Sequence, residues 1–126
     1  MAICARTASA LQEAAAHIHK TTGHKVFHKA VDVTDSTAVA AFDAAVEAPS
    51  GRVDICVTNC GGPPSNMFKN TKPEDWRSAF DQLLMSNMSF AKETLPRMQK
   101  NKWGRLIPIT SSAVIAVDGG LVRSLL

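Results

Sequence analysis

A short apolar run that ends in a glycine-rich turn is the part of this sequence best suited to binding a ligand. The run, Val53–Val57, contains β-branched side chains and is typical of a buried strand. It ends at Thr58–Gly62 (TNCGG), where two glycines allow a ligand to approach the main chain closely. A buried parallel strand that ends in such a turn forms one wall of a ligand crevice in open α/β sheets. An ordinary turn between a strand and a helix is the alternative interpretation.

Metal binding is a second possible chemistry, because the chain contains four histidines. His17 and His19 are two residues apart and would face different sides of a helix, whereas His24 and His28 bracket a turn and a strand. The ligands of a metal ion must converge on one point, and this spacing gives no such convergence. We therefore predict no metal site.

The composition excludes several other classes of function. With 126 residues, 45% hydrophobic and 20% charged, the chain fits one small globular domain. The net charge of +3 is scattered, so no basic stripe indicates nucleic acid or an anionic membrane as a partner. No apolar run approaches the roughly 20 residues of a membrane span, and no signal peptide is visible. We expect a cytoplasmic protein with reduced cysteines, none of them at metal-site spacing: Cys4, Cys56 and Cys60.

Strands and helices are expected to alternate along the first half of the chain. Thr7 or Ser9 could cap the first helix, Gly23 follows it, and Asp35 or Ser36 could cap the second. The expected elements are a strand at Ala2–Ala5, a helix at Ala10–Lys20, a strand at Lys25–Val33, a helix at Thr37–Glu47 and the strand at Val53–Val57.

The second half is expected to contain one long helix, Glu74–Lys100, and a strand, Arg105–Thr110. Apolar side chains recur in the helix near a period of 3.6 residues, and Thr71 is a possible cap. Pro96 should kink or interrupt the helix, because its ring removes a backbone hydrogen bond. Strands that alternate with helices indicate a parallel sheet with helices on both faces.

With its elements in this order, the sequence resembles the short-chain dehydrogenase/reductase family. Each matching motif is weak singly, but their order and separations make them strong together. They are ICAR at Ile3–Arg6, VDVTD at Val31–Asp35, TNCG at Thr58–Gly61, the long helix at Trp76–Trp103 and GRLIPITSS at Gly104–Ser112. VTNxGGPP followed by ITSSxV is most similar to a divergent branch labelled 3-oxoacyl-carrier-protein reductase-like. The resemblance implies an α/β, Rossmann-like, three-layer αβα fold and a single partial NAD(P)-binding domain over residues 1–126.

The resemblance also implies a cofactor site built from strand ends. Arg6 would bind the 2′-phosphate of NADP, because a guanidinium offers a fork of donors to phosphate oxygens. This preference for NADP rests on Arg6, and NAD is the alternative cofactor. Asp32 and Val33 would lie beside the adenine. A solvated surface arginine and a turn or capping aspartate are the alternative interpretations of Arg6 and Asp32.

The remaining implied site residues follow the fourth and fifth strands of the family. Asn59, Cys60 and Gly61 would line the cofactor through main-chain contacts, and Cys60 has no expected redox role. Ser112 would be the catalytic serine that hydrogen-bonds the oxygen of a small carbonyl or alcohol substrate. Ser111 is the neighbour with which it could be confused, and an ordinary turn is the alternative for this pair.

The sequence departs from the family pattern in four respects. The first strand with its glycine-rich turn, which cradles the pyrophosphate, has no counterpart before Ala2. The chain has no tyrosine, so the Tyr-x-x-x-Lys pair that exchanges the proton is missing, and Ser124 is the nearest match to the tyrosine. Leu83 stands where active members carry an asparagine that holds a relay water. The last two strands and the substrate loop are also lacking.

These departures leave two interpretations of function open. The first is an NADP-dependent oxidoreductase of the short-chain type, inactive as this chain alone and part of a longer product. The second is a non-catalytic remnant that binds nucleotide weakly or associates with a partner. Family members associate through the long helix, so residues 74–100 are the expected interface of a homo-oligomer. Without a first strand, the two remaining strand pairs would have no shared neighbour and would expose apolar edges.

Overall fold

The computed structural model describes residues 1–62 and 67–109, apart from the side chain of Ser50. It confirms the predicted α/β class, with strands and helices that alternate along the chain. The elements are β1 (Ala2–Ala5), α1 (Ala8–Thr22), β2 (Phe27–Ala30), α2 (Ser36–Ser50), β3 (Ile55–Thr58), η1 (Phe68–Asn70), α3 (Pro73–Phe80), η2 (Asp81–Met85), α4 (Ser86–Lys100) and β4 (Arg105–Pro108).

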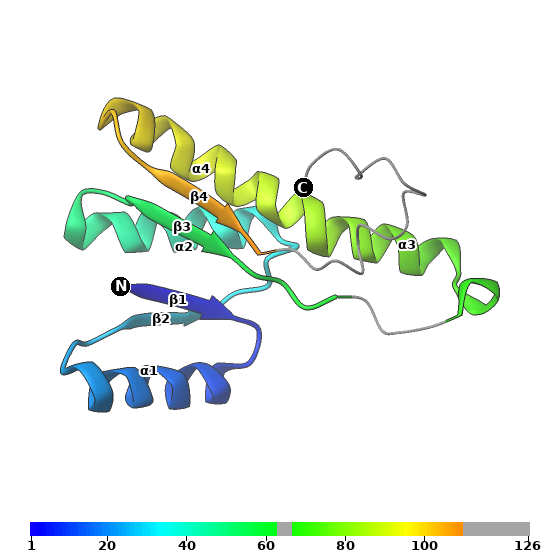
Figure 1. The fold of residues 1–126 in the computed structure, drawn as a ribbon, viewed down its shortest axis with the longest axis horizontal. Helices are drawn as coiled ribbons and strands as arrows, with labels where there is room; N and C mark the ends of the chain where they lie inside the picture. Colours follow the sequence, from blue (N-terminus) through cyan, green and yellow to red (C-terminus); the bar gives the residue numbers. More distant parts are fainter. Residues whose placement is uncertain (63–66, 110–126) are drawn as a thin grey trace, which may run out of the picture.

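The described strands form two separate parallel sheets of two strands each. β1 pairs with β2, and Ala2 lies opposite Phe27. β3 pairs with β4, and Ile55 lies opposite Arg105. The two pairs share no hydrogen-bonded neighbour among the described residues, as the resemblance led us to expect. All four arrows point in the same direction in Figure 1.

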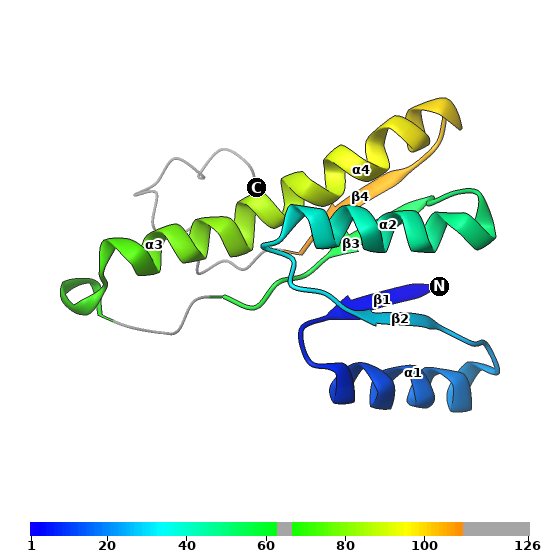
Figure 2. The same cartoon turned by 180° about the vertical axis from the view of Figure 1, so that it is seen from behind.

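Helices cover the strands in layers. α2 and α4 lie behind β3 and β4 in Figure 1 and in front of them in Figure 2, so both helices occupy one face of the sheets. α1 packs on β1 and β2, where it buries Leu11 and Ala15. Successive strand side chains point to opposite faces. Because Ala2 and Cys4 of β1 face the core beneath α2, α1 takes the opposite face and completes the predicted three layers.

The core lies where α2 and α4 meet the two sheets. Its buried members are Val31, Val39, Phe42 and Phe90, of which Val39 is completely enclosed. Phe42 also stacks on Phe27 of β2, with ring centroids 5.9 Å apart. Since this cluster reaches β1 through Ala2 and Cys4 and β3 through Cys56, it links the two sheets without a backbone ladder between them.

Local signals at the helix ends were predicted well. Gly23 and Gly51 follow α1 and α2 with φ of +74° and +69°, angles that glycine adopts at little cost. Asp35 caps α2, since its carboxylate accepts hydrogen bonds from the amides of Thr37 and Ala38. The predicted cap of α1 is not confirmed, because Thr7 precedes the helix without a capping hydrogen bond from its side chain and Ser9 lies inside the helix.

The long helix differs from its prediction. It is divided into α3 and α4 by the π-helical turn η2, and Pro96 lies within α4 without ending it. The proposed cap Thr71 is wrong, because Lys72 precedes α3 and its amide donates to the Asp75 carboxylate. The predicted strand Lys25–Val33 is also too long, since only the four residues of β2 pair with β1.

The expectation that Val53–Val57 is a fully buried strand is wrong. Ile55 and Val57 of β3 are 55% and 57% exposed, whereas Cys56 between them faces the core. The described helices cover only one face of β3, so alternate side chains remain open to solvent. Within residues 1–62 and 67–109, no helix is long and apolar enough to cross a membrane.

Candidate functional site

The carboxyl ends of the parallel strands meet at one edge of the structure and carry most of the predicted site residues. Figure 1 shows the four arrowheads at this edge. Arg6 follows β1 directly, and Asp32 lies two residues beyond β2. Asn59, Cys60 and Gly61 follow β3. Parallel sheets place ligand crevices at this edge, so the topology brings the predicted residues to a suitable location.

Arg6 and Asp32 lie close enough to interact. The Asp32 carboxylate accepts hydrogen bonds from the amide and the hydroxyl of Thr34, at 3.0 and 2.7 Å. These bonds lower the pKa of Asp32 below its ordinary value, and the positive charge of Arg6 lowers it further. Asp32 is therefore an ionised turn residue, in agreement with the alternative interpretation of this side chain, and both side chains remain exposed. Val33 is half-buried against the core.

Side-chain hydrogen bonds connect the end of β3 to the region of the π-helical turn η2. The Thr58 hydroxyl donates to the side-chain oxygen of Asn87, whose amide nitrogen donates to the Leu83 carbonyl. Cys60 Sγ lies 3.3 Å from the hydroxyl of Ser86, which donates to the Gln82 carbonyl. The residues after β3 are thereby held against the junction of α3 and α4.

Asn87 is the polar residue at this junction that the sequence interpretation missed. Its position in the sequence follows the same 3.6-residue period as the apolar residues Phe80 and Phe90, so the pattern alone does not single it out as a polar site residue. The π-helical turn changes which side chains align, and π-turns occur frequently at functional sites. Leu83, which stands where the family places an asparagine, lies inside this turn and is half-buried. A polar residue one helical turn beyond Leu83 was the signal available in the sequence.

The glycines after β3 leave the main chain open. A Cβ atom added to Gly61 would meet only the side-chain nitrogen of Gln82, at 3.9 Å, and one added to Gly62 would meet nothing within 4 Å. No described residue therefore crowds the main chain at Gly61 and Gly62. The open turn and the exposed pair Arg6–Asp32 fit the adenosine side of a dinucleotide, whose nicotinamide would supply the hydride chemistry.

The cysteines give no sign of a metal or reactive-thiol site in the described part of the chain. No group of three or more histidine, cysteine or acidic side chains is positioned there to hold a metal ion. Burial raises the pKa of Cys4 and of Cys56, which keeps both thiols protonated and unreactive at neutral pH. The predicted catalytic Ser112 and its neighbour Ser111 lie outside the described residues, as does Ser124.

Comparison with known sequences identifies the family. The short chain dehydrogenase family matches residues 1–120. The chain belongs to the short-chain dehydrogenase/reductase family. It is 30% identical over 90 residues to the 3-oxoacyl-[acyl-carrier-protein] reductase FabG of Escherichia coli (strain K12), an alignment that covers 71% of this chain and 37% of that protein. Nodulation protein G of Azospirillum brasilense is 32% identical over 89 residues, which cover 71% of this chain and 36% of that protein.

Solved structures of short-chain dehydrogenases and reductases share the fold. A variant actinorhodin polyketide ketoreductase with NADPH has a TM-score of 0.83 and 24% identity, and the match covers 95% of this chain and 46% of that one. L-Sorbose reductase from Gluconobacter frateurii, complexed with NADPH and L-sorbose, has a TM-score of 0.78 and 28% identity, with 85% and 41% covered. The predicted Rossmann fold and the FabG-like branch of this oxidoreductase family are thus confirmed, whereas the chain spans little more than a third of the length of FabG.

Proposed function

We propose that this chain is the part of an NADP(H)-dependent short-chain oxidoreductase that binds the adenosine end of the cofactor. In this proposal Arg6 binds the 2′-phosphate, Asp32 and Val33 border the adenine, and Asn59, Cys60 and Gly61 line the path toward the nicotinamide. The complete enzyme would transfer hydride between the nicotinamide and a small carbonyl or alcohol substrate. Ser112 would hydrogen-bond the substrate oxygen.

The observation that carries this proposal is the exposed Arg6 beside Asp32 at the carboxyl edge of β1 and β2. A guanidinium there faces solvent, so it can bind a phosphate without first losing a buried partner. NADPH and NADP in solved structures of family members support the choice of cofactor, although another relative, 7α-hydroxysteroid dehydrogenase, was solved with NADH. The preference for the 2′-phosphate is therefore the part of the proposal to test first.

Replacing Arg6 with glutamine is expected to weaken NADPH binding by about tenfold or more, because a charge-assisted hydrogen bond contributes ~1.5–3 kcal/mol. The affinity for NADH should stay unchanged, since NADH has no 2′-phosphate. Titration of nicotinamide fluorescence measures both affinities on the same preparation.

Lys25→Gln is the matched control, because Lys25 is an exposed cation before β2, at the opposite end of the strands from Arg6. An equal loss of affinity in both variants would mean that only net charge matters. A loss of affinity for NADPH and NADH alike would contradict the assigned role of Arg6.

The catalytic part of the proposal is tested by the oxidation of NADPH with small carbonyl compounds. Turnover that survives Ser112→Ala would contradict the role of Ser112.

Association through the long helix is the second candidate function, favoured by an apolar stripe on α3 and α4. Five large side chains of α3, η2 and α4 are 41–53% exposed: Trp76, Phe80, Leu84, Met88 and Leu95. The first four recur at intervals of four residues, so they follow one side of the helical rod. An exposed stripe of this kind is typical of a protein interface, and a second copy of the chain is the proposed partner.

Leu84→Glu is expected to shift the chain from dimer to monomer in sedimentation velocity, because a buried unpaired carboxylate is costly at an interface. Lys20→Glu on α1 is the matched control, since Lys20 is exposed and lies on a different helix from the stripe. A wild-type chain that sediments as a monomer at all concentrations would contradict this proposal.

A further inference from the structure

The backbone ladder of β3 ends where the segment assigned to the cofactor begins. Thr58 is the last residue of β3, and its carbonyl accepts a hydrogen bond from the Ile109 amide. Beyond Thr58, no main-chain group of residues 59–62 is hydrogen-bonded to the main chain of another described residue. The proposed cofactor contacts at residues 59–61 therefore lie on a segment that the sheet itself does not hold.

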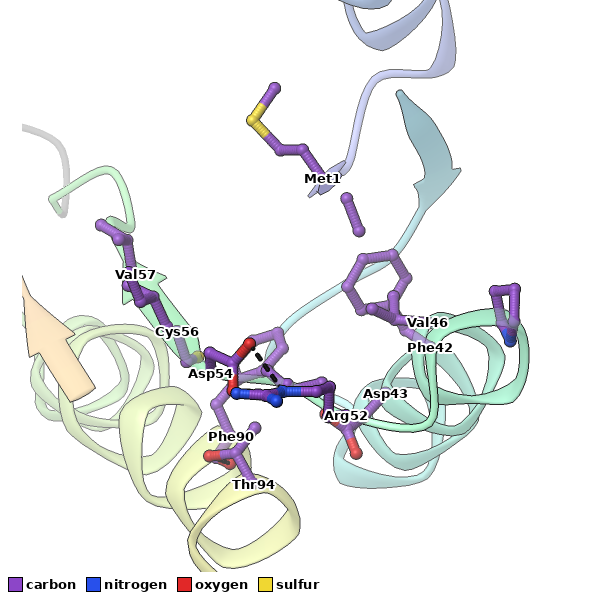
Figure 3. A pocket seen from close by; sticks show the side chains of 14 residues that line it. Met1, Phe42, Asp43, Val46, Arg52, Asp54, Cys56, Val57, Phe90 and Thr94 are labelled. Carbon is purple, nitrogen blue, oxygen red and sulfur yellow. Dashed lines mark hydrogen bonds and ion pairs between the residues drawn. The ribbon is translucent and has the colours of Figure 1, made fainter. Parts of the chain in front are cut away.

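The side chains of β3 alternate between the helices and solvent, and this alternation continues past the strand. Figure 3 shows Cys56 directed toward the helical layer and Val57 directed away from it. Thr58 and Cys60 are half-buried, whereas Asn59 between them is exposed. Successive residues of an extended chain point to opposite faces, so Thr58 and Cys60 share the side that faces the helices.

Asn87 of α4 attaches Thr58 to the helical layer and is bonded at both ends of its amide group. Its side-chain oxygen accepts a hydrogen bond from the Thr58 hydroxyl, and its side-chain nitrogen donates to the Leu83 carbonyl in η2. A side-chain amide carries an acceptor and two donors in one plane, so it can bind both neighbours at once. The end of β3 is thereby fixed relative to the π-helical turn.

Ser86 makes a second and weaker attachment. Its side chain is enclosed, and its hydroxyl hydrogen is donated to the Gln82 carbonyl. The Cys60 thiol, 3.3 Å from the Ser86 oxygen, is therefore the donor in that contact. A thiol is a weak donor, so the bond of Asn87 to Thr58 contributes more to holding this segment.

We propose that Asn87 is a positioning residue, which holds Thr58 so that the main chain of Asn59–Gly61 keeps the conformation that binds the cofactor. Asn87 acts through Thr58 and does not itself contact the cofactor. This inference rests on the proposed function, in which residues 59–61 line the path toward the nicotinamide. NADPH and NADH share that part of the molecule, so Asn87 should affect the two cofactors equally.

Asn87→Leu is expected to weaken the binding of NADPH and of NADH alike by about tenfold, because the Thr58 hydroxyl loses its acceptor. Titration of nicotinamide fluorescence measures both affinities. Arg6→Gln, in contrast, should weaken the binding of NADPH alone. Unchanged affinities in Asn87→Leu, or a loss for one cofactor only, would overturn the proposal.

Thr58→Val removes the same hydrogen bond from the other side and should weaken both affinities in the same direction. The double variant Asn87→Leu with Thr58→Val should lose no more affinity than Asn87→Leu alone, because both changes remove one shared bond. Additive losses would show that Asn87 does not act through Thr58 and would overturn the proposal.

Thr94→Val is the matched control for a lost hydrogen bond on α4. The Thr94 hydroxyl is enclosed and donates to the Phe90 carbonyl, and Figure 3 shows the two side chains close together on α4. This variant should unfold more easily in urea but keep both cofactor affinities. An equal loss of affinity in Thr94→Val would show that only the stability of α4 matters, which would overturn the proposal.

Alkylation of Cys60 by iodoacetamide tests the attachment in the chain without cofactor. Asn87→Leu should raise the rate at Cys60 by about tenfold, because the freed segment moves away from Ser86 more often. The rate at Cys4 of β1 is the internal reference and should not change. Mass spectrometry measures both rates, and an unchanged rate at Cys60 would overturn the proposal.

These measurements separate a failure of this inference from a failure of the proposed function. A wild-type chain that binds neither NADPH nor NADH would overturn the proposed function, and the role of Asn87 toward the cofactor with it. Cofactor binding by the wild type, together with unchanged affinities in Asn87→Leu, would overturn the positioning role alone.

Discussion

Replacing Arg97 with methionine is expected to lower the free energy of unfolding by about 3–5 kcal/mol. The Asp43 carboxylate is 4% exposed and is paired with the Arg97 guanidinium. The two facing atoms are enclosed and have no other hydrogen-bond partner. Methionine keeps the apolar stem but leaves the buried carboxylate unpaired, and burying such a charge is costly. Urea unfolding measures the change.

Glu47→Gln is the control for this result, because Glu47 binds the same guanidinium at 2.9 Å but is 32% exposed. An exposed pair contributes about 0–1 kcal/mol, so this variant should unfold close to the wild type. The double variant Asp43→Leu with Arg97→Met should regain most of the stability, since apolar side chains can replace a buried pair. Equal effects of Arg97→Met and Glu47→Gln would contradict the importance of burial.

Gly104→Ala is expected to cost about 1–3 kcal/mol of unfolding free energy, because it overpacks a closed site. A Cβ atom at Gly104 would lie 2.5 Å from the Cβ of Met98 and still closer to its Cγ and Sδ atoms. Met98 is 4% exposed, and its carbonyl accepts the Trp103 amide in the turn between α4 and β4. The side chain therefore has little room to move away. Thermal or urea unfolding measures the loss.

Gly62→Ala provides the matched comparison, since a Cβ atom there meets no atom of the described residues within 4 Å and Gly62 has no positive φ. That substitution should leave stability unchanged or raise it slightly. Met98→Ala costs stability by leaving a cavity, yet combined with Gly104→Ala it should cost less than the sum of the two single changes. Strictly additive costs would show that the two side chains do not compete for space.

Features fixed by neighbouring residues could be predicted from the sequence. Gly23 ends α1 and Asp35 caps α2 because both act within a few residues of their own position. The strand β1 was also predicted with its observed bounds. For the candidate site, the resemblance placed Arg6, Asp32 and the residues after β3 at one edge, and strand direction does bring them there. Their roles toward the cofactor stay predictions.

Features that depend on distant residues could not be predicted. The pairing of Asp43 with Arg97 follows from the docking of α2 on α4, which no local pattern encodes. The exposed face of β3 depends on which helices cover it, so an apolar sequence alone predicted burial wrongly. The π-helical turn at Asp81–Met85 has no simple residue signature, and the bond between Asn87 and Thr58 depends on how this turn docks against the end of β3.

Among residues 1–62 and 67–109, no ladder joins the two sheets, and this affects how the described part of the chain tolerates substitutions. Each sheet is built from strands of one half of the chain, β1 and β2 in the first half and β3 and β4 in the second. The two halves are joined by side-chain contacts, among them those of Phe42, Phe90 and Arg97. The hydrogen bonds of a backbone ladder depend little on which side chains the strands carry. The stability of an interface made by side chains, in contrast, changes when one of those side chains is substituted. Single substitutions can therefore weaken or strengthen the packing between the two halves in small steps, while the fold within each half stays the same.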